Sequence, residues 1–255
     1  DYRSMGYLPV ALRNYLVRLG WSHGDDEIIS TEQLIEWFDI DDINKSASRF
    51  DFKKLDDLNG HYIRQSSDDE LLVRIKDMLP HLDFAALRGL EIDPKAPPRS
   101  DVALAHEIAA LAPSISNGAA LAERFEKAGW DKVSAAMPAL KERAKTLAEL
   151  VVGALFLAAD TPLKLDDKAA KLLDQDARTT LAALIPRFTA AKTWTAEALE
   201  SEVRAYSEET GAKLGKIAQP LRAALTGRTV SPPVFTVLEV LGREKSLERI
   251  KVCAQ

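Results

Sequence analysis

Residues 213–235 constrain the fold of this chain more than any other stretch. Gly227 is placed to end a helix, because glycine adopts the left-handed C-cap conformation without a steric penalty. Pro232 and Pro233 then fix two φ angles and remove two amide donors. Pro220 disfavours a helical conformation at the residue before it, so the first helix either kinks there or begins just after it. The stretch predicts a helix, a glycine stop, a stiff basic loop with exposed carbonyls, and a second helix.

Apolar residues recur at three- and four-residue spacing over most of the chain, which is the period of an amphipathic helix. Since no long alternating strand pattern occurs, the predicted fold class is all-α. Helices are expected over 9–20, 32–38, 69–79, 102–112, 119–128, 166–173, 176–192, 195–210, 234–241 and 244–252, with one long central helix over 138–159. We also expect short helices over 41–64, a surface linker over 90–98, and N-caps at Ser30 or Thr31, Asp68 and Thr195.

Length and composition allow one large core or two to three small domains in the 255 residues. The single cysteine, Cys253, excludes an internal disulfide and a thiolate zinc site, and it predicts a cytoplasmic protein in a reducing environment. No run approaches the roughly 18 apolar residues of a membrane span, so no membrane association is predicted. The chain carries no secretory leader. Because it starts with Asp1 and not with Met, we expect a fragment or a processed product.

The net charge of −5 is distributed unevenly. Residues 211–255 carry eight basic and three acidic side chains, so an acidic body precedes a basic end. A basic end of this kind is typical of a surface that faces phosphates. The alternative is that these side chains belong to ordinary solvated helix faces.

Residues that carry catalytic or metal chemistry are not grouped in any recognisable pattern. The four histidines, at 23, 61, 81 and 106, lie far apart, and none has a second histidine or cysteine at ligand spacing. No glycine-rich phosphate loop or nucleophile elbow is present. Adjacent acidic residues point about 100° apart on a helix, so they do not form catalytic carboxylate pairs. From residue types alone the sequence predicts a soluble helical binding module with no catalytic residue, metal or cofactor of its own.

Three stretches resemble the C-terminal part of bacterial glutamyl-tRNA synthetases, which are class I aminoacyl-tRNA synthetases. The first is DYRSMGYLPVALRNYLVRLGW at residues 1–21, and the second is KSASRFDFKKLDDLNGHYIR at 45–64. The third is the stretch 213–235 together with LGREKSLERI at 241–250. These stretches cover both ends of the chain.

The resemblance implies a helical stem-contact domain at residues 1–80, followed by an anticodon-binding region of two helical subdomains at 81–160 and 161–255. Segment 85–137 matches the family weakly and is longer than its usual pattern. The HIGH and KMSKS signatures of the catalytic domain are absent, so that domain is expected upstream and this chain is expected to be inactive alone. The implied partner is tRNA(Glu), bound by a monomer, while ATP and Mg would serve only the parent enzyme.

The same resemblance implies which residues contact the anticodon. Arg222, Ser231, Pro232 and Val234 match positions that face anticodon bases in similar enzymes. Arg143, expected in the long helix, resembles the reader of the third anticodon base. An arginine suits this role because its planar fork donates two hydrogen bonds to a base edge.

Two alternatives stay open for these arginines. Arg222 is also compatible with a simple charge near a helix C-terminus, and Arg143 with a surface ion pair to Glu142 or Glu149. If neither arginine binds RNA, the long apolar helix and the acidic body are typical of a helical module that binds a partner protein.

Overall fold

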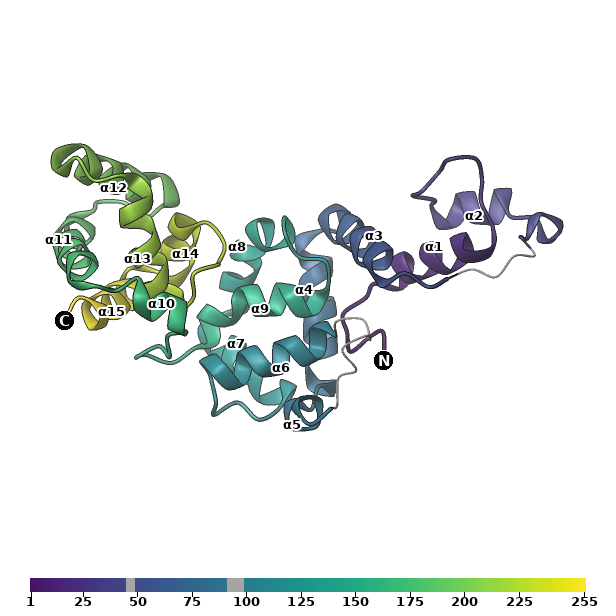
Figure 1. Ribbon diagram of the computed structural model, residues 1–255, viewed down its shortest axis with the longest axis horizontal. Helices are drawn as coiled ribbons and strands as arrows, with labels where there is room; N and C mark the ends of the chain where they lie inside the picture. The colour runs from purple at the N-terminus through teal and green to yellow at the C-terminus, as the bar shows by residue number, and fades with distance from the viewer. Residues whose placement is uncertain (45–48, 91–98) are drawn as a thin grey trace.

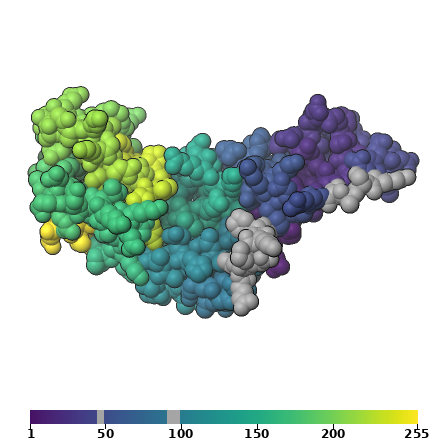
Figure 2. All heavy atoms as spheres, viewed as in Figure 1, coloured from purple at the N-terminus to yellow at the C-terminus, as the bar shows by residue number. Residues whose placement is uncertain are grey.

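The computed structural model describes residues 1–44, 49–90 and 99–255. Within these ranges the chain forms fifteen α-helices, two 3-10 helices and no strand, which confirms the all-α prediction. The helices are arranged in an elongated row, with α1–α3 at one end, α4–α9 in the middle and α10–α15 at the other end (Figure 1). The space-filling view shows the C-terminal residues lying directly against the middle of the molecule (Figure 2), where α14 contacts α8.

The bounds of the helices follow the predicted pattern in most places. They are α1 Pro9–Gly20, α2 Thr31–Trp37, α3 Phe52–Gln65, α4 Asp68–Met78, α5 Phe84–Arg88, α6 Ser100–Leu111, α7 Gly118–Ala128, α8 Trp130–Lys141, α9 Leu147–Ala158, α10 Asp167–Lys171, α11 Gln175–Ala190, α12 Ala196–Thr210, α13 Leu214–Thr226, α14 Val234–Leu241 and α15 Arg243–Cys253, with 3-10 helices at Ile40–Asp42 and Leu79–His81.

The hydrophobic core is continuous through the middle and C-terminal helices and breaks into smaller clusters at the N-terminal end. Helix α9 lies at its centre, and nine of its twelve residues are buried. The N-terminal helices contribute Ala11 and Ile63 to this core and also bury two small clusters, one around Tyr15 and Leu55 and one around Trp21 and Ile29. The large core therefore fixes the middle helices against the C-terminal ones.

The predicted long helix over 138–159 is wrong, because α8 ends at Lys141 and α9 begins at Leu147. Thr146 is the N-cap of α9, and its hydroxyl accepts the Glu149 N–H at 3.2 Å. The Glu149 carboxylate accepts the Lys145 N–H at 2.8 Å in return. These bonds satisfy amides that a helix start leaves unpaired, so they favour a break over a continuous helix.

Other differences also come from capping residues. Instead of several short helices over 41–64, the described residues of this segment form the 3-10 turn at 40–42 and one fourteen-residue helix, α3, whose N-cap is Asp51. The N-cap of α4 is Ser67, whereas the sequence predicted Asp68. Thr195 is the N-cap of α12, as predicted. Most of the predicted linker, residues 91–98, lies outside the described residues.

The stretch 213–235 forms the helix, stop, loop and helix that the sequence predicted. Helix α13 runs through Pro220 from Leu214 to Thr226, so the alternative of a late start after the proline is excluded. Gly227 ends α13 with φ of 72°, and its N–H donates to the Ala223 carbonyl at 2.9 Å. The left-handed conformation explains why glycine occupies this position.

Candidate nucleic-acid interface

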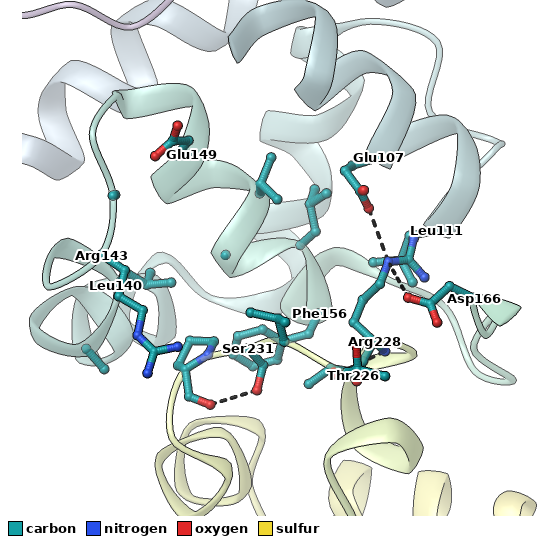
Figure 3. A pocket seen from close by; sticks show the side chains of 18 of the residues that line it. Glu107, Leu111, Leu140, Arg143, Glu149, Phe156, Asp166, Thr226, Arg228 and Ser231 are labelled. Carbon is teal, nitrogen blue, oxygen red and sulfur yellow. Dashed lines mark hydrogen bonds and ion pairs between the residues drawn. The ribbon is translucent and has the colours of Figure 1, made fainter. Parts of the chain in front are cut away.

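A groove of about 810 Å³ separates the middle helices from the C-terminal ones (Figure 3). Its walls come from α6, the end of α8, the turn between α8 and α9, helix α9, the start of α10 and the loop 226–233. Leu140, Val152 and Phe156 contribute apolar surface, while carboxylates and cations line the ends. The groove combines flat apolar surface with a few polar groups, which is typical of a ligand site.

Arg143 lies in the turn 142–146 and is exposed at one end of the groove. The prediction that it lies within a long helix is therefore wrong. Among the described residues its guanidinium makes no hydrogen bond or ion pair, so the proposed surface pairs with Glu142 and Glu149 do not form. Figure 3 shows the side chain reaching from the turn towards the loop that carries Ser231. A free guanidinium in this place is available to a ligand.

Arg222 holds the opposite wall together. Its Nη1 donates to the Ser231 Oγ at 2.6 Å, to the Pro232 carbonyl at 2.9 Å and to the Ser231 carbonyl at 3.1 Å. The expectation that the carbonyls of this loop are exposed is thus wrong for Ser231 and Pro232. Burial, followed by the positive charge of Arg143, lowers the pKa of Arg222, which places the two arginines within electrostatic reach of each other.

The predicted site residues divide into two groups. Arg143, Ser231 and Pro232 line the groove together. Val234, the first residue of α14, is only 4% exposed and packs in the core, and Arg222 lies behind the loop that it supports. Three of the five predicted residues therefore face the same space, one is buried, and one positions the loop.

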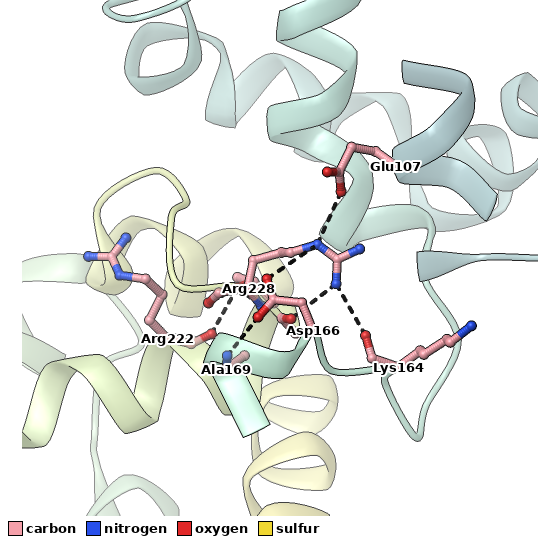
Figure 4. Close-up of polar contacts among 8 residues, drawn as sticks. Glu107, Lys164, Asp166, Ala169, Arg222 and Arg228 are labelled. Carbon is pink, nitrogen blue, oxygen red and sulfur yellow. Dashed lines mark hydrogen bonds and ion pairs between the residues drawn. The ribbon is translucent and has the colours of Figure 1, made fainter. Parts of the chain in front are cut away.

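Arg228 joins the two sides of the groove and was not predicted as a site residue. Its Nε lies 3.1 Å from the Glu107 carboxylate and 4.0 Å from that of Asp166, and its Nη1 donates to the Lys164 carbonyl at 3.2 Å (Figure 4). The Asp166 N–H donates to the Gly227 carbonyl at 3.1 Å. These contacts connect α6, the start of α10 and the loop after α13. No local signal in the sequence indicates them, because Glu107 is 121 residues from Arg228.

Comparison with known proteins identifies the family. A family model described as the anticodon binding domain matches residues 103–254, which is more than half of the chain. The chain belongs to the anticodon-binding domain family. A second model, described as the catalytic domain of class I tRNA synthetases (E and Q), matches residues 1–57. This second match lies inside the predicted stem-contact segment 1–80, so the catalytic-domain model reaches further along the chain than the resemblance implied.

The curated relatives of this chain include glutamate–tRNA ligases. The sequence is 54% identical over 98% of its length to glutamate–tRNA ligase 2 of Brucella ovis and 51% identical over 98% to glutamate–tRNA ligase 2 of Chelativorans sp.. In both cases it covers 46% of the relative, so the chain spans less than half of these proteins. The resemblance to glutamyl-tRNA synthetases is confirmed, and the comparisons favour it over the protein-interaction module.

Solved structures share the fold. The chain aligns over its full length with a glutamate–tRNA ligase from Elizabethkingia meningosepticum at a TM-score of 0.69 and 23% identity, covering 42% of that protein. A glutamate–tRNA synthetase from Elizabethkingia anophelis gives a TM-score of 0.67 at 24% identity and 42% coverage. At these identities the likeness shows that the helical architecture is common to these proteins.

The basic end of the anticodon-binding region uses its four arginines internally. Besides Arg222 and Arg228, Arg243 donates to the Thr189 carbonyl at 3.0 Å and to the Ala191 carbonyl at 2.5 Å. Arg249 is 1% exposed and donates to two buried carbonyls. The sequence allowed two interpretations of these arginines, a patch that faces phosphates or ordinary solvated helix faces. The structure fits neither, because all four arginines donate hydrogen bonds within the chain.

The part of the chain that the structure describes holds no group of three or more histidines, cysteines and carboxylates that is suited to binding a metal ion. None of its helices has the length and apolar character needed to cross a bilayer.

Proposed function

We propose that this chain binds the anticodon of tRNA(Glu) in the groove between its middle and C-terminal helices. The observation that carries the proposal is that Arg143, whose guanidinium has no partner in the described chain, lines the same groove as the loop Ser231–Pro233. That loop is held in place by Arg222 from behind. The unpaired guanidinium of Arg143 thus shares the groove with the polar groups of the fixed proline loop and with apolar side chains.

The chemistry of the groove suits unstacked bases better than a phosphate backbone. Five carboxylates (Glu107, Glu142, Glu149, Asp166 and Asp167) and three cations (Arg143, Lys168 and Arg228) line it, so its overall charge is negative. A phosphate would be repelled over much of this surface, whereas a base can pack on the apolar walls. Single-stranded loop bases are the RNA elements that proteins read most readily.

Each predicted residue has a distinct role in the proposal. Arg143 donates two hydrogen bonds to the edge of one base, and the Ser231 hydroxyl and Pro232 contact another. Arg222 acts from behind the loop, because its Nη1 holds the Ser231 hydroxyl and the Ser231 and Pro232 carbonyls in place. Val234 supports the loop from the core, since it is buried at the start of α14.

For the whole protein we propose a class I glutamate–tRNA ligase that attaches glutamate to tRNA(Glu) with ATP and Mg. The relatives that support this are more than twice as long as the chain. Within the chain, residues 1–80 would contact the tRNA stem, and 81–160 and 161–255 would form the two anticodon-binding subdomains. We further propose that the protein is cytoplasmic and monomeric, and that the chain alone does not activate glutamate.

The test is binding of a fluorescently labelled anticodon stem-loop of tRNA(Glu) to the 255-residue chain. Arg143→Ala should raise Kd by about fivefold or more, because a bidentate base contact contributes about 1–3 kcal/mol. Arg204→Ala is the matched control, since Arg204 lies on α12 in an exposed ion pair with Glu200 and outside the groove. Equal Kd values for the two variants, or no binding of either the stem-loop or whole tRNA(Glu) at low salt, would overturn the proposal.

A further inference from the structure

A second cavity, of about 130 Å³, lies inside the C-terminal helices and is separate from the anticodon groove. Thr161 and Leu163, which follow α9, form one side of it. Arg178 of α11 and Arg249 and Cys253 of α15 form the other. The remaining walls are apolar, and no aspartate or glutamate lines the cavity.

Arg249 carries a buried positive charge that makes no ion pair within the described residues, although the charges of Glu248 and Asp160 act on it from further away. Its side chain is 1% exposed, and its Nη1 and Nη2 donate to the carbonyls of Leu225 at 2.6 Å and Ala159 at 2.9 Å. The buried Nε finds no acceptor in the described part of the chain. Burial lowers the pKa of Arg249 to about 10, so the side chain is still positive at neutral pH. A buried cation without a counter-ion costs several kcal/mol of folding free energy.

The other polar groups of the cavity also donate. The Thr161 hydroxyl is buried and makes no hydrogen bond with any described residue. Arg178 uses its Nε to donate to the Leu173 carbonyl at 3.1 Å. Its charge opposes the rise that burial causes in the pKa of Cys253, so it lies within electrostatic reach of that thiol. Two cations and an unused hydroxyl therefore line a space whose walls hold no carboxylate.

We propose that this cavity binds a small inorganic monoanion of the halide class, held by Arg249, Arg178 and Thr161. The ion supplies a counter-charge in direct contact with Arg249, which Glu248 and Asp160 do not. It also accepts the hydrogen bonds that the Arg249 Nε and the Thr161 hydroxyl do not make within the described residues. The cavity has room for one such ion with accompanying water and is too small for a nucleotide. Because Arg249 also ties α15 to the ends of α9 and α13, anion binding stabilises the C-terminal helices.

Thermal unfolding of the chain in sodium chloride and in sodium gluconate tests the proposal, since gluconate is too large for the cavity. An anion that binds only the folded state and shifts its equilibrium tenfold should raise Tm in chloride by about 3–5 °C for a chain of this size. Thr161→Val and Arg178→Met should each lose most of this difference. Thr179→Val is the control, because Thr179 is exposed on α11 and its hydroxyl donates to the Gln175 carbonyl.

Two results would overturn the inference. One is the lack of a specific chloride effect. Either Tm is the same in both salts, or the rise in Tm in chloride is as large in Thr161→Val and Arg178→Met as in the unchanged protein, which would indicate a general salt effect. The other comes from crystals soaked in sodium bromide. We expect an anomalous bromide peak next to Arg249, whereas density for water alone in the cavity would exclude an anion there.

Discussion

Arg222→Ala should lower the free energy of unfolding by about 2–3 kcal/mol. The Nη1 of Arg222 has three acceptors at 2.6–3.1 Å on Ser231 and Pro232. One nitrogen carries only two hydrogens, and a hydrogen bond from a charged donor contributes about 1.5–3 kcal/mol. Two such bonds at the lower value give about 3 kcal/mol, and solvation of the released carbonyls returns part of it.

Urea unfolding followed by far-UV circular dichroism measures this loss. Arg143→Ala is the matched control, because the side chain is exposed and has no partner in the described chain, so its stability should change by less than about 0.5 kcal/mol. In a double-mutant cycle, Arg222→Ala and Ser231→Ala should couple by more than about 0.5 kcal/mol. If Arg222→Ala is as stable as Arg143→Ala, then Arg222 does not hold the loop, and the division of roles between the two arginines is refuted.

Three further predictions concern the stability of the helices outside the proline loop. Burial and the hydrogen bond to Asp56 raise the pKa of Tyr7 above 10.0. The stability that the protonated phenol contributes is therefore full below about pH 10 and is lost as the pH rises further. The urea midpoint should fall less over this pH range in Tyr7→Phe than in the unchanged protein. Gly118→Ala should cost about 2–4 kcal/mol in the same assay, because a Cβ there would lie 1.7 Å from the Leu79 carbonyl oxygen. Asn59→Ala should cost about 2–3 kcal/mol, since this buried amide bonds backbone groups 51 and 86 residues away, and a crystal structure of the variant should show the turn 142–146 displaced.

Local signals explain which parts of the fold were predictable from the sequence. Pro9 at the start of α1, the Thr195 cap of α12 and the Gly227 stop of α13 each act within a few residues, and each was predicted. The break between α8 and α9 was not, because the apolar pattern continues through it. A threonine such as Thr146 also occurs inside helices, so by itself it does not indicate an N-cap. The hydrogen bond that holds the turn comes from Asn59, which is 86 residues away from Lys145.

The candidate site shows the same limit. The resemblance to a known family selected Arg143 and Ser231, yet only the fold brings residues 88 positions apart to one groove. From helix-capping rules alone, Arg222 would be predicted only as a positive charge near the C-terminus of a helix. Its contact with the Pro232 carbonyl depends on how the proline loop folds back over α13, and neither periodicity nor composition indicates that path.

The turn between α8 and α9 also limits which insertions and deletions this chain can accept. Asn59 holds the Lys145 carbonyl, and the Gly6 carbonyl accepts the Leu147 N–H at 2.9 Å, so both partners are set by segments distant in sequence. One added residue in 142–146 would lengthen the path by up to about 3.8 Å and break one of these bonds or move Arg143 away from the proline loop. The number of residues in this turn should therefore be fixed more strictly than their identity.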